Sequence, residues 1–294
     1  MKKLAAKVRR VGLIANAEKP EVAQLIQRAA AALKRAGRTI CAEPGTLGLL
    51  GPGTPGADSI ADLAQVTDLL LVFGGDGTML RAAREVAGCR TPLLGINAGN
   101  LGFLTAVSPE DLLGALRQLW AGKFRLEERE LLGGVVLRGG ERTSLLALND
   151  FVLARGITSR LIELEVLVDG ELLTRYRCDG LIASSPTGST AYSLAAGGAI
   201  VSPDAHVMTL TPICPHTLSI RPVVISLEAA VEVGLVSTRQ VATLAVDGQQ
   251  HFELSAGDRI QICRSLRKVQ MVRLEGTSFF TTLRQKFSWS GTNV

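Results

Sequence analysis

The first 120 residues alternate short apolar runs with longer amphipathic stretches. Val11–Ile14, Leu69–Phe73 and Pro92–Ile96 are apolar runs of strand length, and the stretch that begins at Pro20 repeats its apolar positions every three or four residues. Continuous apolar runs are typical of strands buried on both faces, and the second pattern is typical of helices packed on them. This alternation predicts βαβ units, and so a Rossmann-like α/β domain with a parallel sheet over residues 1–124.

After about residue 125 the pattern changes to strand-like alternation. LIELEVLVDGELLTRYR and VATLAVDGQQHFELSAG each place an Asp-Gly pair between two such runs, which is the signal of a tight hairpin. Residues 125–268 are therefore expected to form an antiparallel β-rich domain, with one helical stretch around residues 191–197. Helical spacing returns in residues 269–294, and this tail is expected to pack back on the first domain.

Composition and charge exclude several classes of protein. The chain has 294 residues, of which 47% are hydrophobic and 20% charged, so it is a globular chain of about two domains. The net charge of +5 comes without a lysine or arginine block, and we expect no nucleic-acid partner. No apolar run approaches the roughly 18 residues that span a bilayer, and we expect no membrane partner.

The cysteines and histidines give no metal or disulfide pattern. The five cysteines contain no CxxC pair, and the three histidines are scattered along the chain. Neither a protein-built metal site nor a disulfide framework is expected, and a reducing, cytoplasmic location fits best.

Residues 70–80, LLVFGGDGTML, place a glycine turn directly after an apolar strand. Amides of such a turn face the edge of the sheet where α/β proteins bind ligands, and they can approach a phosphate closely. Asp76 repels phosphate unless a divalent cation intervenes or the group being oriented is an alcohol, and a kinase meets both conditions. The alternative is a tight turn in which Asp76 only caps the next helix, whose start is expected near Thr78.

Two further segments carry more polar groups than a plain connection needs. The first places Asp179 before an apolar strand, then a hydroxyl-rich SSPTGST loop, then a short helix. A loop of this kind can donate hydrogen bonds to sugar and phosphate, or it can simply cap the helix. The second sets Asn149 and Asp150 within an apolar strand, where each group would cost about 1–3 kcal/mol if buried without a partner. This pair either bonds to backbone or binds a ligand.

These segments resemble those of the NAD kinases, the ATP/polyphosphate-dependent NAD kinase family. The resemblance is carried by IANAEKP (14–20), FGGDGT (73–78), GINAGNLGFL (95–104), LND (148–150), DGLIASSPTGSTAYSLAAGGAIVSP (179–203) and PHTLSIRP (215–222). GGDGT alone also occurs in similar form in lipid kinases and phosphofructokinases. The long block from residue 179 is specific.

The resemblance implies transfer of the terminal phosphoryl group of ATP to the 2′-hydroxyl of the adenosine ribose of NAD, giving NADP. It implies a divalent cation, Mg²⁺, carried with the nucleotide, and no metal ligand from the chain. Asp76 would accept the proton of the 2′-hydroxyl, or only orient it. Gly77 would lie against the dinucleotide and Phe103 against the adenine.

The resemblance also implies nucleotide contacts in the β-rich domain. Asn149 and Asp150 would bind adenine and ribose hydroxyls, and Asp150 stands where the family has glutamate. The other implied nucleotide-contacting positions are Arg160, Arg177, Asp179, Thr190, Ala191, Tyr192, Ser193, Leu194, Ala195 and Gln249.

Partners and rival functions complete the hypothesis. The family forms homodimers and homotetramers, and we expect one of these. Whether the donor includes polyphosphate, and whether NADH is accepted, stays open. One rival is a kinase that uses the same turn on a lipid or sugar. The other is a non-catalytic NAD sensor, which would keep Asp179 but would have no need of Asp76.

Overall fold

The computed structural model describes residues 2–18, 20–99, 102–105, 107–156, 160–236 and 241–289. The chain divides into two compact units, Met1–Glu128 with Lys268–Val294 and Arg129–Arg267. The sequence pattern alone placed these boundaries at 124/125 and 268/269. Two long strands, β5 (Phe124–Arg138) and β16 (Arg259–Leu274), belong in part to each unit.

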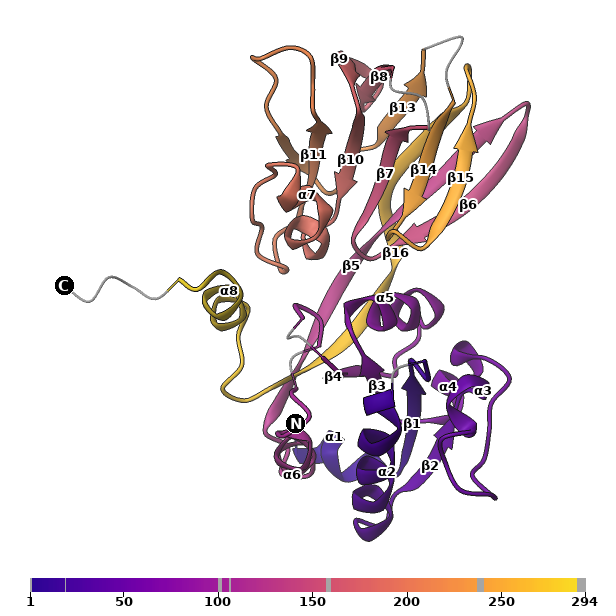
Figure 1. Ribbon diagram of the computed structural model, residues 1–294, viewed down its shortest axis with the longest axis vertical. Helices are drawn as coiled ribbons and strands as arrows, with labels where there is room; N and C mark the ends of the chain where they lie inside the picture. Colours follow the sequence, from indigo (N-terminus) through magenta and orange to yellow (C-terminus); the bar gives the residue numbers. More distant parts are fainter. Residues whose placement is uncertain are drawn as a thin grey trace, which may run out of the picture. The chain divides into compact units, whose positions relative to one another are not determined.

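The first unit contains most of the helices (Figure 1). Its other elements are α1 (Lys2–Lys7), β1 (Arg10–Ala15), α2 (Pro20–Arg35), β2 (Thr39–Ala42), α3 (Pro44–Leu47), α4 (Ile60–Val66), β3 (Leu69–Gly74), α5 (Asp76–Glu85), β4 (Leu93–Asn97), α6 (Leu112–Trp120) and α8 (Phe279–Phe287). In the described part of the chain, no helix is both long enough and apolar enough to cross a membrane.

Four parallel strands of this unit lie in the order β2-β1-β3-β4. Gly12 of β1 pairs with Cys41 of β2 on one side and with Leu70 of β3 on the other. Every residue of β3 is buried, as its continuous apolar run predicts. Chain order reverses between β1 and β3, which is the point where sheets of this kind bind ligands outside the carboxyl ends of the strands.

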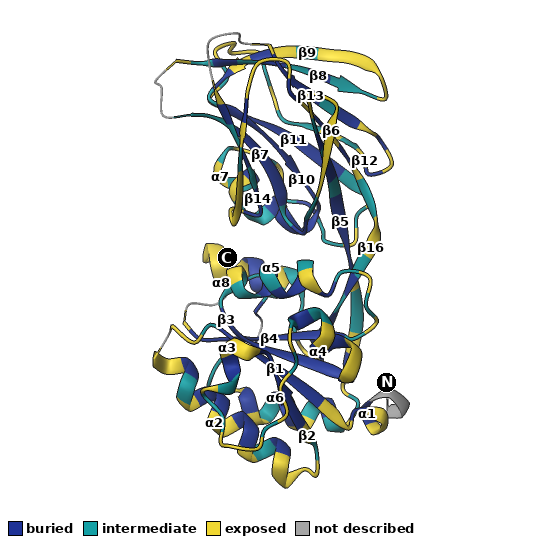
Figure 2. Cartoon of the chain, turned by 90° about the vertical axis from the view of Figure 1, so that its right-hand side faces the viewer, coloured by how far each residue is buried: buried dark blue, intermediate teal, exposed yellow. Residues whose placement is uncertain are grey.

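Helices cover both faces of these strands. α2 contacts α6, and α4 contacts α5. Figure 2 shows α5 on one side of the strands and α2 and α6 on the other. α2 begins at Pro20, as predicted, because proline suits the first turn of a helix, and it buries Val22, Leu25, Ile26, Ala29, Ala30 and Leu33 against the sheet.

Helix α5 begins at Asp76 rather than near Thr78. Gly75 occupies the N-cap position and offers no side-chain hydrogen bond. The Thr78 side chain packs against Gly74, where an added Cβ would lie 2.3 Å from Thr78 Oγ1. The prediction of a helix start near Thr78 is therefore wrong, because packing against β3 holds this hydroxyl inside the first turn.

The second unit is built almost entirely of strands. Its elements are β6 (Glu141–Ala147), β7 (Asp150–Arg155), β8 (Ile162–Val168), β9 (Glu171–Cys178), β10 (Gly180–Ser184), the 3₁₀ helix η1 (Thr187–Thr190), α7 (Tyr192–Ala195), β11 (Val207–Ile213), β12 (Val223–Ser226), β13 (Val231–Leu235), β14 (Ala242–Val246) and β15 (Gln250–Leu254).

Two antiparallel layers share one core in this unit. One sheet has the order β12-β11-β10-β7-β14-β15, and the other includes the neighbouring strands β13, β8 and β9. Phe151 and Leu181 from the first sheet and Leu164 and Val233 from the second belong to the same buried cluster. The predicted fold class is confirmed, since a unit with a parallel sheet is joined to an antiparallel β-rich unit.

Both Asp-Gly pairs form the predicted hairpins. Asp169 and Gly170 have φ of 52° and 82° between β8 and β9, and Asp247 and Gly248 have φ of 50° and 64° between β14 and β15. Two-residue hairpin turns need positive φ at both central positions, which Asp and Gly tolerate.

Gly12 allows α4 to approach β1 closely. A Cβ at this position would lie 2.4 Å from Leu70 Cδ2 and 2.9 Å from Leu63 Cγ. We expect Gly12→Ala to lower the free energy of unfolding by about 1–3 kcal/mol, the usual cost of overpacking. Urea unfolding measures this. Gly45→Ala is the control, because no atom lies within 4 Å of its added Cβ. Equal effects of the two substitutions would contradict the prediction.

Candidate functional site

The loops at the carboxyl ends of the parallel strands are tied together by backbone hydrogen bonds. The amide of Asn16, after β1, donates to the carbonyl of Phe73 at 3.0 Å, and the amide of Ala98, after β4, donates to that of Gly74 at 3.1 Å. The glycine turn of residues 74–77 therefore sits between two loops that are fixed to it. A ligand at this edge would meet a preformed surface.

The carboxylate of Asp76 accepts hydrogen bonds from the segment after β4. Oδ2 accepts from the amide of Phe103 at 2.9 Å, and Oδ1 accepts from the amide of Leu104 at 3.0 Å and from Thr105 Oγ1 at 3.3 Å. A Cβ on Gly102 would lie only 2.0 Å from Asp76 Oδ1, so glycine is required for this approach. The structure thus brings together Asp76 and Phe103, two residues singled out in the sequence.

This arrangement leaves Asp76 able to act on a ligand. A carboxylate has about four acceptor positions, and among the described residues Oδ2 is engaged by a single donor. The side chain is half-buried at the start of α5. Its orientation is fixed by two backbone amides, and Oδ2 keeps acceptor capacity for a further hydrogen-bond donor.

An ion pair supports the same helix from the side of β2. Glu43, which is buried, accepts from Arg81 Nη2 at 2.8 Å and from the amide of Ala15 at 3.2 Å. Arg81 lies in α5, so this contact links the ends of β1 and β2 to the helix that starts at Asp76. The Arg81 side chain stays 42% exposed and keeps donors for an anion.

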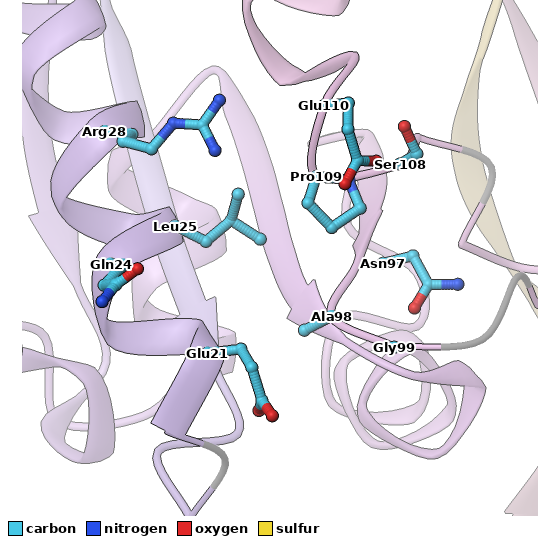
Figure 3. A pocket seen from close by; sticks show the side chains of 10 residues that line it. All are labelled: Glu21, Gln24, Leu25, Arg28, Asn97, Ala98, Gly99, Ser108, Pro109 and Glu110. Atoms are coloured by element: carbon cyan, nitrogen blue, oxygen red, sulfur yellow. The ribbon is translucent and has the colours of Figure 1, made fainter.

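A cavity of about 510 Å³ lies beside the carboxyl end of β4 (Figure 3). Figure 3 shows side chains of α2 on one wall and residues 97–99 and 108–110 on the other. It holds the carboxylates of Glu21 and Glu110 and the guanidinium of Arg28. This charge balance does not favour a triphosphate, and the residues predicted from the sequence do not line this cavity. In the described part of the chain, no group of three or more His, Cys, Asp or Glu could hold a metal ion.

A second carboxylate organises the strand that carries Asn149 and Asp150. Asp247 is buried, and its two oxygens accept from the amides of Leu148 at 3.1 Å, Asn149 at 2.7 Å and Asp150 at 3.2 Å. In return the amide of Asp247 donates to the carbonyl of Asp150 at 3.0 Å. The start of β7 is thereby locked to the β14–β15 hairpin.

The carboxyl group of Asp150 is buried beside that of Asp247. Burial, and secondly the negative charge of Asp247, raise the pKa of Asp150 to about 7. Near neutral pH this side chain therefore changes between a hydrogen-bond donor and an acceptor. A ligand hydroxyl that donates to it would favour the ionised form.

The hydroxyl-rich loop packs directly on Asn149. The carbonyl of Asn149 accepts from the amide of Ser185 at 2.8 Å and from Ser184 Oγ at 3.3 Å. A Cβ on Gly188 would lie 2.2 Å from the same oxygen. The structure therefore brings together the Asn149–Asp150 pair and the loop of residues 187–195.

Asp179 lies at the opposite end of β10 from this group. It pairs with Arg155, whose Nε is 2.6 Å from Asp179 Oδ1. Ser184, at the other end of β10, pairs in register with Asp150. At about 3.3 Å per residue, the five steps from 179 to 184 span about 16 Å. The predicted residues of this unit thus fall into two groups.

The remaining predicted positions differ in exposure. Arg160, Arg177, Tyr192, Ala195 and Gln249 are exposed, and Thr190, Ala191 and Leu194 are half-buried. Ser193 is buried, and its hydroxyl lies 2.9 Å from Thr211 Oγ1. Gly77 follows Asp76 in the first turn of α5 and is exposed.

Sequence reasoning missed three residues of this site. Asp247 was recognised only as part of a hairpin signal, although the same Asp also holds the amides of residues 148–150. Arg155 pairs with Asp179 and Arg81 pairs with Glu43, and each of these contacts joins segments far apart in sequence. A polar residue at the end of an apolar strand was the only local signal for Arg155.

Two family profiles match the chain. The one described as the ATP-NAD kinase N-terminal domain matches residues 11–124, and the one described as the ATP-NAD kinase C-terminal domain matches residues 148–274.

Curated relatives extend this similarity over nearly the whole chain. The NAD kinase of Moorella thermoacetica is 43% identical over 284 residues, which are 97% of this chain and 91% of the relative. The NAD kinase of Thiobacillus denitrificans is 45% identical over 232 residues, which are 79% of this chain and 80% of the relative.

Solved structures agree with the sequence comparison. A crystal structure of yeast NADH kinase complexed with NADH matches with a TM-score of 0.87 and 25% identity, covering 98% of this chain and 89% of that one. A crystal structure of an NAD kinase from Archaeoglobus fulgidus in complex with ATP matches with a TM-score of 0.75 and 27% identity. The match covers 96% of this chain and 100% of that one. Together with the profiles and the relatives, this similarity shows that the chain belongs to the NAD kinase family.

Proposed function

We propose that this member of the NAD kinase family uses Asp76 to orient the 2′-hydroxyl of the adenosine ribose of NAD and to accept its proton. The terminal phosphoryl group of ATP is transferred to that oxygen, giving NADP. Phosphoryl transfer depends mainly on positioning and charge neutralisation, so a fixed acceptor for the hydroxyl is the main requirement on the chain.

One observation carries this proposal, namely the fixed geometry of Asp76. The amides of Phe103 and Leu104 hold its carboxylate at the carboxyl end of β3, and Oδ2 keeps acceptor capacity. A carboxylate that served only as a helix cap would bond to amides of its own first turn. Asp76 bonds instead to a different loop, which supports a role in orienting a ligand.

The donor is proposed to enter as magnesium-bound ATP. Mg²⁺ carried by the nucleotide offsets phosphate charge and permits phosphate near a carboxylate. The N-terminus of α5, with Gly75 at its N-cap, faces the phosphates with the positive end of the helix dipole. Arg81, five residues after Asp76 in the same helix, has further N–H donors that can bind a phosphate. The archaeal neighbour was solved with ATP, which supports this donor; polyphosphate is a second donor to test.

The acceptor dinucleotide is proposed to contact both groups of residues in the β-rich unit. Asn149 and Asp150 bind adenine and ribose hydroxyls, beside the loop of residues 187–195 and near Gln249. Asp179, with Arg160 and Arg177, contacts the nucleotide at the other end of β10. Phe103 lies against the adenine. The yeast neighbour was solved with NADH, which supports a dinucleotide acceptor.

The proposal extends to assembly and location. β9 is an edge strand that exposes Leu172 by 54% and Leu173 by 38%, and an edge of this kind pairs readily with another chain. We propose a homodimer or homotetramer on this basis. All five cysteines are free thiols, which supports a cytoplasmic location.

One assay tests the proposed activity. The protein is incubated with NAD, ATP and Mg²⁺, and NADP is measured with an NADP-specific dehydrogenase. Parallel reactions replace ATP with polyphosphate and NAD with NADH to define the donor and acceptor. NAD binding without NADP formation would instead indicate a sensor.

Asp76→Asn keeps the size of the side chain but removes its charge and its ability to accept a proton. We expect kcat to fall by about 10²- to 10⁴-fold. The thermal midpoint should fall slightly, because the Asn side chain can accept through one oxygen only and leaves the amide of Phe103 or Leu104 without its bond. Asp58→Asn, which changes an exposed carboxylate of the same unit, should leave kcat within about twofold. A kcat for Asp76→Asn within about tenfold of the wild type would remove Asp76 from this role.

Asp150 makes stability depend on pH. Its raised pKa means that the folded chain keeps a proton that the unfolded chain releases, so stability falls as pH rises from about 4 to about 7 and is level above that. Between pH 5 and pH 8 the free energy of unfolding of the wild type should fall by about 2.5 kcal/mol relative to that of Asp150→Asn. Urea unfolding at both pH values without nucleotide measures this. If the difference in unfolding free energy between the wild type and Asp150→Asn does not change with pH, the pKa of Asp150 is not raised.

The exposed leucines of β9 test the assembly. Introducing Leu172→Glu with Leu173→Glu places charge on the edge and should reduce the particle mass toward that of one 31.1 kDa chain. Light scattering after size-exclusion chromatography measures the mass. Val66→Glu changes an exposed aliphatic residue of the first unit and should keep the wild-type mass. An unchanged mass in the double variant would exclude β9 as the interface.

A further inference from the structure

The C-terminal helix α8 contacts the segment that holds Asp76. The ring centroid of Phe103 lies 6.4 Å from that of Phe279 and 6.2 Å from that of Phe287, and the ring planes are tilted by 44° and 41°. Such tilted pairs are each worth about 0.5–1.5 kcal/mol beyond the area that they bury. Phe279 and Phe287 are the first and last residues of α8, so both ends of the helix contact the Phe103 ring.

A cation adds to this contact. Lys286 Nζ lies 5.8 Å from the centroid of the Phe103 ring, within the range of cation–π attraction. The same ring therefore meets two aromatic side chains and one ammonium group from a single helix.

α8 is a capped helix with buried positions of its own. Ser278 caps its start by accepting from the amide of Thr281 at 3.1 Å, and Thr282 and Leu283 are buried. The cap and the burial stabilise the helix, so it can support the ring that packs on it.

Phe103 connects this support to the carboxylate. Its ring contacts α8, and its backbone amide donates to Asp76 Oδ2 at 2.9 Å. The next amide, of Leu104, donates to Oδ1 at 3.0 Å. Gly102, which precedes these two residues, packs tightly against the carboxylate, because an added Cβ would lie 2.0 Å from Asp76 Oδ1. A shift of the Phe103 backbone that follows its ring would move the two amides that orient Asp76.

We propose that α8 positions Asp76 for catalysis, with Phe279 and Phe287 holding the ring of Phe103 and the backbone of Phe103 and Leu104 holding the carboxylate. The inference rests on the proposed role of Asp76. Phe279 and Phe287 are positioning residues, because they act through Phe103 and not on the reacting atoms. Helix α8 thereby supports a glycine turn about 200 residues before it in the sequence.

Phe287→Ala is the first test, because this side chain is at the end of the helix and already 37% exposed. We expect kcat to fall about 5- to 50-fold while the dissociation constant of ATP changes little, since a small misplacement of a catalytic group affects turnover. Phe279→Ala with Phe287→Ala should give a larger loss. Phe280→Ala is the matched control, because this phenylalanine of the same helix is 62% exposed and contacts Phe279 instead of Phe103.

A double-mutant cycle separates positioning from general destabilisation. If α8 acts through Asp76, Phe287→Ala should lower the residual kcat of Asp76→Asn by less than about twofold. A destabilised fold would instead lower activity by the same factor in both backgrounds. Thermal midpoints of all variants are measured alongside.

Hydrogen exchange reads the geometry directly. Exchange of the Phe103 and Leu104 amides should speed up in Phe287→Ala and stay at the wild-type rate in Phe280→Ala. The amide of Leu71 in β3 serves as an internal reference. This measurement does not depend on activity, so it remains decisive if Asp76 proves not to be the proton acceptor.

The outcomes distinguish the two proposals. A near-normal kcat for Asp76→Asn overturns the proposed function. A normal kcat for Phe287→Ala and for the double α8 variant overturns the role of α8. So does a fall in kcat on Phe287→Ala that is equal in the wild type and in Asp76→Asn. Neither result affects the proposed role of Asp76. Unchanged exchange at Phe103 and Leu104 overturns the mechanical link itself.

Discussion

The hydrogen bonds from the Phe103 and Leu104 amides to Asp76 are the contacts on which the candidate site depends. A carboxylate in a glycine turn at the start of a helix is unfavourable beside a phosphate unless its charge and direction are controlled. Backbone amides provide both, because they are rigid and their bonds to an anion are about twice as strong as neutral ones. The close approach required at Gly102 follows from this arrangement.

The β-rich unit also contains a carboxylate that is bound by backbone amides. Asp247 accepts from three consecutive amides and fixes the strand end that carries Asn149 and Asp150. In both units a carboxylate from one turn is bound by the backbone of a segment remote in sequence. Because such a backbone is already ordered, a ligand that binds its side chains loses less free energy to conformational entropy.

The local elements could be predicted from the sequence, and the long-range contacts could not. The strands around Val11 and Leu69 and both Asp-Gly hairpins follow from patterns within ten residues, so periodicity and turn chemistry were sufficient. The bond from Phe103 to Asp76 joins positions 27 apart, and that from Asn149 to Asp247 joins positions 98 apart. The helix start near Thr78 was predicted wrongly for a local reason, since Gly75 takes the N-cap position and the Thr78 side chain packs on Gly74 within the first turn.

The two carboxylates proposed to contact the substrate, those of Asp76 and Asp150, differ in burial and in their neighbours. Asp76 is half-buried and bound by amides, whereas Asp150 is buried beside another carboxylate and its pKa is raised to about 7. Mild acid therefore protonates Asp150 and changes it from an acceptor to a donor toward a ribose hydroxyl. A loss of affinity for the dinucleotide on acidification would thus originate in the β-rich unit, separately from the orientation of Asp76. In this proposal binding and proton transfer depend on two carboxylates that lie in different environments.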